Sequence, residues 1–202
     1  MVKAPMESFI LAMAEEFRTL APELLATPKS SAYRIYRDTR FSSDKTPYKT
    51  QIAAVFPPRG LGKHEGACLY VHIAPDEVFV GGGLYMPARP DLQAVREHLA
   101  ENHRRLRARI RTRAFRDSFG ELGGAQLSRV PRGFPSEHPA ADLLRHKQFL
   151  ASKQFEPGLA MTPEFQPEVV RTFKALLPMV RFLNEPILER RAKSLQELAS
   201  GS

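Results

Sequence analysis

The sequence predicts an α+β fold, in which a mainly antiparallel sheet of about four to five strands is covered by helices. Short apolar and aromatic runs in the first half of the chain are separated by gaps that leave no room for a crossover helix, which indicates antiparallel pairing. Apolar residues recur at helical spacing at the start, in the middle and near the end of the chain. No internal repeat or linker divides the 202 residues, so we expect one domain over residues 1–202.

The first element is expected to be an amphipathic helix. Met6, Phe9, Ile10, Met13 and Phe17 fall at spacings of three and four residues, so they share one helical face. A connector that contains several prolines follows this helix.

Strands are expected after this connector. The segments predicted as strands are residues 32–38, 50–56, 68–73 and 78–84, and residues 148–155 are the candidate for a fifth. The third and fourth segments are joined by APDE, a connection short enough for a hairpin. Tyr70 and His72 should share the sheet face opposite Leu69, Val71 and Ile73.

Three helical regions are expected in the second half. Pro90 suits the first turn of a long helix that should end within the FGELGG of residues 119–124. Ser136 is a candidate cap for a short helix that runs to Lys147. The last region opens at Thr162, carries a strong apolar stripe, and should be kinked or broken at Pro178.

Several classes of protein are excluded by composition. No run approaches the roughly 18 apolar residues of a membrane span, and glutamates interrupt the apolar start of the chain, so we expect a cytoplasmic protein with no membrane partner. The single cysteine, Cys68, rules out an intramolecular disulfide and a thiolate metal cage, and a buried structural thiol is the expectation for it. No metal-binding or cofactor motif is present, so no metal site and no cofactor are expected.

The net charge of +8 is concentrated in one stretch. Residues 104–116, RRLRARIRTRAFR, begin at Arg104, end at Arg116 and hold seven arginines and no acid. Two interpretations stand: a basic helix that attracts nucleic-acid phosphates, or an ordinary solvated helix face.

A second charged stretch, RDTRFSSDKTPYKT, occupies residues 37–50. Its cations outnumber its acids, and guanidinium groups bind carboxylate or phosphate through paired hydrogen bonds, so the stretch indicates a site for an anion. Asp38 and Asp44 would orient the arginines, while Lys45 would supply a point charge and Tyr48 a hydroxyl. The candidate ligand-binding residues are Arg34, Arg37, Asp38, Arg40, Asp44, Lys45, Tyr48 and Lys49. The alternative is a salt-bridge cluster that holds a loop on the sheet.

The pattern Arg34-x-x-Arg37-Asp38-x-Arg40-Phe41, followed by Asp44-Lys45-x-x-Tyr48, resembles the signature of an uncharacterised bacterial family, domain of unknown function 2461. The stretches YVHIAPDEVFVGGGLYMP and PRGFPSEHPAADLLRHKQFL also resemble recurrent blocks of that family, and the resemblance extends from about Met6 to Leu183. The family has no activity to transfer. Its members usually open with a further helical segment, so the resemblance implies that this chain lacks one.

Two further groups are candidates for the wall of the same pocket. Gly81, Gly82 and Gly83, with Tyr85 after them, either bring backbone amides close to an anion or mark a bulge or close strand packing. Arg132 and His138 are the second group, where His138 either acts as an acid or base or bonds to a neighbouring backbone group.

These observations predict a cytosolic protein whose cationic pocket binds a small anionic ligand bearing phosphate or carboxylate. They leave open whether it is an enzyme. The alternatives are a nucleic-acid-associated protein that uses residues 104–116, and a structural or protein-interaction role in which the signature is only a salt-bridge cluster.

Overall fold

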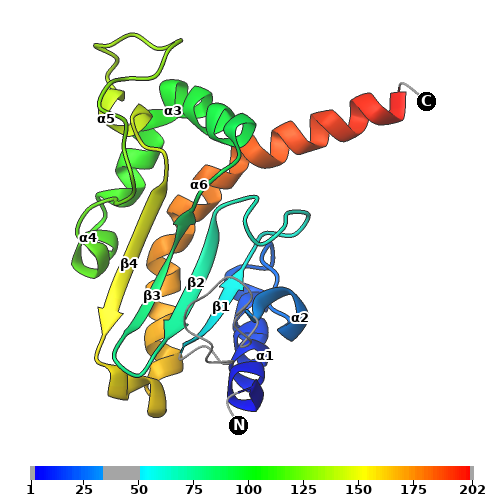
Figure 1. The fold of residues 1–202 in the computed structure, drawn as a ribbon, viewed down its shortest axis with the longest axis vertical. Helices are drawn as coiled ribbons and strands as arrows, with labels where there is room; N and C mark the ends of the chain where they lie inside the picture. Colours follow the sequence, from blue (N-terminus) through cyan, green and yellow to red (C-terminus); the bar gives the residue numbers. More distant parts are fainter. Residues whose placement is uncertain (1–2, 34–50, 201–202) are drawn as a thin grey trace, which may run out of the picture.

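The computed structural model describes residues 3–33 and 51–200, which form one antiparallel sheet with helices packed against it (Figure 1). The strands pair in the order β1-β2-β3-β4. They are β1 (Ile52–Phe56), β2 (Cys68–Ile73), β3 (Val78–Leu84) and β4 (Phe149–Phe155). The helices are α1 (Lys3–Leu20), α2 (Pro28–Ser31), α3 (Arg89–Ile110), α4 (Arg113–Phe119), α5 (Ala141–Leu144) and α6 (Phe165–Ser200), with a 3₁₀ helix, η1 (Pro157–Met161). The predicted α+β class is confirmed.

The strands predicted near residues 50–56, 68–73, 78–84 and 148–155 are all present. The strand predicted over residues 32–38 lies mostly outside the described residues. Its first residue, Ala32, forms an antiparallel bridge with Ala54, and the Tyr33 amide donates to the Ala53 carbonyl at 3.1 Å. Residues 32 and 33 therefore lie along the edge of β1 that faces away from β2.

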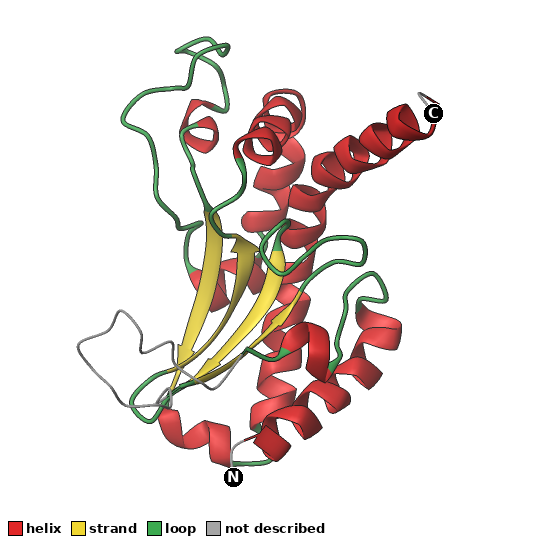
Figure 2. Ribbon diagram, turned by 45° about the vertical axis from the view of Figure 1, so that its right-hand side comes forward, coloured by secondary structure: helices red, strands yellow, loops and turns green. Residues whose placement is uncertain are grey.

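One face of the sheet packs against α6, which runs behind the strands in Figures 1 and 2. Side chains alternate between the two faces of a strand, and Leu69, Val71 and Val80 are fully buried on the helical side. Gly82 of β3 pairs with Leu69, and an added Cβ there would lie 3.4 Å from the Leu176 side chain of α6. The core is therefore a layer between the sheet and α6, and the opposite sheet face is left to form a site.

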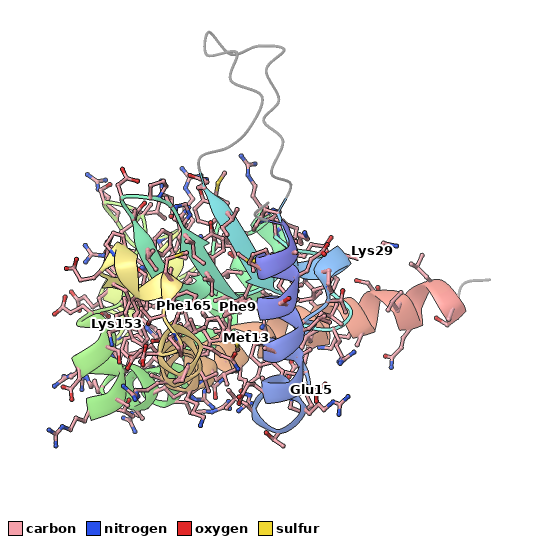
Figure 3. All side chains as sticks on the ribbon, turned by 90° about the horizontal axis from the view of Figure 1, so that it is seen from below. Phe9, Met13, Glu15, Lys29, Lys153 and Phe165 are labelled. Carbon is pink, nitrogen blue, oxygen red and sulfur yellow. The ribbon has the colours of Figure 1, made fainter. Side chains whose placement is uncertain are left out.

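Aromatic side chains join α1 to this core. Phe17 packs edge-on against Phe56 of β1, with ring centroids 5.1 Å apart, and Phe56 packs in the same way against Phe173 of α6 at 5.7 Å. Figure 3 shows Phe9 beside Phe165, where α1 meets the start of α6, and the two ring centroids are 5.7 Å apart. These contacts hold α1 by the apolar stripe that its sequence predicts.

The structure of the second half of the chain corrects three expectations drawn from the sequence. The long helix ends at Ile110, because Thr112 accepts a hydrogen bond from the Phe115 amide and caps a separate helix, α4. Ser136 caps no helix, since α5 begins at Ala141 and has no side-chain cap. Pro178 does not break α6, because the buried residues on both sides of it hold the helix against the core. None of the helices within the described ranges has the length and apolarity that a bilayer span requires.

His146, just before β4, should make stability depend on pH. Its Nδ1 donates to the Gln148 backbone carbonyl at 3.0 Å. In the neutral ring Nε2 therefore accepts from the side-chain amide of Gln126 at 3.1 Å. Burial lowers the pKa of His146 below its ordinary value of 6.5, although the Gln148 carbonyl acts in the opposite direction. The unfolded chain then binds the proton more readily than the folded one. The contribution of neutral His146 to folding stability is therefore complete above pH 6.5 and declines as the pH falls.

We expect chemical unfolding at a series of pH values to show this decline in the wild-type protein. In His146→Gln this part of the decline should be absent, whereas replacing the exposed His64 with Gln should retain it. Equal pH profiles for the two variants would contradict the assignment.

Candidate functional site

A cavity of about 510 Å³ lies on the sheet face that α6 does not cover. We call it the sheet cavity. It is lined by Tyr33, Gln51, Ile52, Ala53, Val55, Lys63, His64, Gly66, Cys68, Tyr70, Phe79, Gly81, Gly82, Gly83, Tyr85, Leu150, Ala151 and Ser152. Its volume is in the range of pockets that hold small molecules.

The floor of the sheet cavity is made by strand residues with short side chains. Gly81 on β3 pairs with Ser152 on β4, and Gly83 pairs with Leu150. Gly81 and Gly83 carry no side chain and are themselves buried, so the floor at these positions is closely packed strand backbone with no projecting group. The hollow thus results from glycine and serine at positions where most strands carry bulkier residues.

Aromatic rings form the walls. The ring of Tyr70 on β2 lies 6.1 Å from that of Tyr33 and 5.6 Å from that of Phe79, centroid to centroid. The Tyr70 hydroxyl lies 3.2 Å from Nδ1 of His72, and the His72 ring stacks on Phe79 at 4.8 Å. The predicted placement of Tyr70 and His72 on one face is confirmed by this contact. His72 fixes two of the wall residues, and its Nε2 lies 3.7 Å from the Glu77 carboxylate.

Basic groups lie at the β1 end of the cavity. Lys63 donates from Nζ to the Ala32 carbonyl at 2.7 Å and lies 5.2 Å from the centroid of the Tyr33 ring. The His64 ring lies 6.1 Å from the same ring. No Asp or Glu is found among the described residues that line the cavity. The described side chains that line the cavity are therefore basic or neutral.

The weak acids of the cavity are held in their protonated forms. Burial raises the pKa of Tyr33 to about 12 and that of the Cys68 thiol to about 12. Burial, and then the charge of Glu77, raise the pKa of Tyr70. The Cys68 thiol also donates to the Gly66 carbonyl at 3.3 Å, so it is a buried structural thiol, as predicted, and a poor nucleophile.

The predicted ligand-binding residues of the signature all fall in residues 34–50, outside the described part of the chain. They are Arg34, Arg37, Asp38, Arg40, Asp44, Lys45, Tyr48 and Lys49. The two residues that flank this segment, Tyr33 and Gln51, both line the sheet cavity.

The candidate wall residues are divided. Gly81, Gly82, Gly83 and Tyr85 line the sheet cavity. Arg132 and His138 are not among its lining residues and lie in the loop between α4 and α5. Arg132 is exposed, and His138 accepts a hydrogen bond from the Ala140 amide at 3.0 Å, so it serves the loop that carries it.

Several lining residues had not been singled out in the sequence. Lys63 and His64 lie in a Gly- and Pro-rich connection that gives no local sign of a site. Tyr33 was predicted only as a strand residue. Ser152 gave no clear signal either, because its segment FLASKQF does not alternate, and its position opposite Gly81 is visible only in the structure.

The seven arginines of residues 104–116 are distributed over α3, α4 and the turn between them. Four of the seven form ion pairs: Arg105–Glu185 at 3.0 Å, Arg107–Asp142 at 2.7 Å, Arg109–Glu185 at 3.9 Å and Arg113–Asp117 at 3.2 Å. Arg104, Arg111 and Arg116 are exposed. Because three carboxylates, those of Glu185, Asp142 and Asp117, offset part of the local charge, this stretch favours nucleic-acid binding less than its composition alone would indicate.

Fold and cavity together define an α+β protein with one sheet face packed on a long helix and the other hollowed into a small-molecule-sized cavity. The family model described as "Conserved hypothetical protein (DUF2461)" matches residues 1–182, and the chain belongs to this family. The predicted family membership is therefore confirmed. Comparison with curated proteins and with solved structures gave no significant match. Within the described residues, no group of three or more His, Cys, Asp or Glu side chains is placed to hold a metal ion.

Proposed function

We propose that this protein is a cytosolic binding protein for a small anion that carries phosphate or carboxylate, and that the ligand occupies the sheet cavity. One observation carries the proposal: Tyr33 and Gln51, which flank the cation-rich signature, both line a cavity in which no described residue is acidic. The signature then supplies the charged groups that recognise the anion, and the sheet supplies the surface beneath it.

The balance of charge in the signature supports this proposal. Residues 37–50 hold more cations than carboxylates, so Asp38 and Asp44 leave donors available for an external anion. Tyr33 and Tyr70 also line the cavity and, like any tyrosine at neutral pH, carry no charge that would repel an anion. Cytosolic location is consistent with Cys68, a single reduced thiol that is buried in the sheet.

The test measures thermal unfolding with inorganic phosphate and with small carboxylates, at constant ionic strength. We expect a bound anion at about 100 times its dissociation constant to raise the unfolding temperature by about 5–10 °C. In Arg37→Ala this rise should be lost while the unfolding temperature without ligand is retained. Arg116→Ala, which removes an exposed arginine of α4, is the matched control and should respond as the wild type does.

Two outcomes would overturn the proposal. If Arg37→Ala unfolds without any ligand, the signature is a structural salt-bridge cluster. If the protein responds to no anion but binds DNA with an affinity that falls steeply with salt, the arginines of residues 104–116 carry the function.

A further inference from the structure

We infer that the ligand of the sheet cavity carries a flat apolar ring, and that it lies across the strands with its anionic group beside β1 and its ring over β3 and β4. This inference rests on the proposed function, because both place the ligand in the same cavity. It adds the chemical class of the ligand, an aromatic anion, and the orientation of that ligand in the cavity.

The sheet cavity has a polar end and an apolar end. Lys63 and His64 belong to the connection between β1 and β2, and Tyr33 lies beside β1 through the bridge between Ala32 and Ala54. At the other end the lining comes from β3 and β4 and includes Gly81, Gly83 and Leu150, with the Ser152 hydroxyl as a polar group and no charged side chain from either strand; we call it the apolar end. The strand order β1-β2-β3-β4 separates the two ends. Neighbouring strands lie about 4.8 Å apart, so the distance from β1 to β3 is about 10 Å, the length of a ring with an attached acid group.

The apolar end is flat because glycine is required there. A Cβ on Gly81 would lie 2.9 Å from the Ala151 carbonyl oxygen, and one on Gly83 would overlap the Phe149 carbonyl oxygen. Any larger residue at either position would therefore strain the β3–β4 pair. Both glycines are buried in this close β3–β4 packing, so no side chain projects from the floor here, and a planar group can lie over it at van der Waals distance.

The walls between the two ends are aromatic and held in place. Tyr70 and Phe79 stand on neighbouring strands with ring centroids 5.6 Å apart, and both contact His72, through a hydrogen bond and a stack respectively. Aromatic rings favour edge-on and offset contacts with another ring. Since His72 fixes both rings before any ligand arrives, a ring-bearing ligand binds with little ordering of these side chains.

The experiment separates the contribution of the anionic group to affinity from that of the ring. It uses three probes, inorganic phosphate, phenyl phosphate and benzyl alcohol, each titrated calorimetrically into the full chain. We expect phenyl phosphate to bind about tenfold more tightly than inorganic phosphate, from partial burial of one ring. Benzyl alcohol, which lacks the charge, should bind more weakly than phenyl phosphate by at least a similar factor.

Ser152→Phe tests the direction of the ligand. Ser152 is exposed, lines the apolar end and faces Gly81 across the strands, so a phenylalanine there would fill the space assigned to the ring. We expect this change to weaken phenyl phosphate about tenfold and to leave inorganic phosphate unchanged. Gln154→Phe is the matched control: it lies on the same face of β4, is exposed, does not line the cavity, and should alter neither affinity.

Each outcome decides one statement. Equal affinities for phosphate and phenyl phosphate would contradict the claim that the ligand carries an aromatic ring, while the proposed function would stand. Equal affinities for benzyl alcohol and phenyl phosphate would contradict the claim that the ligand is an anion, while the aromatic ring would stand. Binding of none of the three probes would contradict both claims. A Ser152→Phe variant that binds phenyl phosphate normally, or that loses phosphate equally, would overturn the direction, and the three wild-type titrations decide the ring even if this variant fails to fold.

Discussion

Replacing Gly83 with alanine should remove about 3 kcal/mol or more of folding stability, although it adds a single methyl group. Gly83 has φ +129°, a region that side-chain-bearing residues rarely adopt, and its Cβ would overlap the Phe149 carbonyl oxygen on β4. The methyl group can be accommodated only if β3 and β4 separate. Urea unfolding monitored by circular dichroism measures the loss, and the variant should also have a distorted apolar end of the sheet cavity.

Gly60→Ala is the control that separates the cost of the positive φ from the cost of the steric overlap with β4. Gly60 also has a positive φ, +83°, but an added Cβ there has no heavy atom within 4 Å. It should therefore lose only the conformational part, about 1–2 kcal/mol. If Gly83→Ala is no more destabilising than Gly60→Ala, the β3–β4 pair adjusts freely, and glycine is not required on the floor of the cavity.

The positions of β2 and β3 illustrate what the sequence predicts well. Alternating apolar residues and a short connection placed β2 and β3 at residues 68–73 and 78–84, because one face of each strand is buried by α6. The break between α3 and α4 was missed. The apolar stripe of α3 ends with Leu106 and Ile110 and is not continued by Phe115, which lies five residues after Ile110, and the capping hydroxyl of Thr112 leaves only a weak trace in the sequence.

The candidate site was only partly predictable. Glycines within a strand point to close approach of another group, so Gly81 and Gly83 were identified as a candidate wall. Lys63 was missed because it reaches the cavity through tertiary contacts with Ala32 and Tyr33, which are about thirty residues earlier in the chain. No local pattern encodes such a contact. The role of the signature remains a prediction, because its residues lie outside the described ranges.

Asn184→Leu should cause the second large loss, because it breaks the link between α6 and the start of β2. The buried Asn184 accepts from the Ala67 amide at 2.8 Å through Oδ1 and donates to the Ala67 carbonyl at 2.9 Å through Nδ2. Leucine has a similar volume but leaves both backbone groups of Ala67 buried without partners, and each such group costs about 1–3 kcal/mol. We therefore expect a loss of about 2–6 kcal/mol in urea unfolding, with faster hydrogen exchange at the Ala67 amide.

Thr172→Val is the matched control on the same helix. Thr172 is equally buried, but its hydroxyl donates to the Glu168 carbonyl, which also lies within reach of the helical hydrogen-bond ladder, so valine should leave no group unpaired. The variant should change stability by less than about 1 kcal/mol. Comparable losses in the two variants would mean that any polar deletion in α6 is costly. A loss confined to Asn184→Leu instead assigns the stabilisation to the Ala67 pair, which fixes the segment that leads from Gly66 into Cys68 at the edge of the sheet cavity.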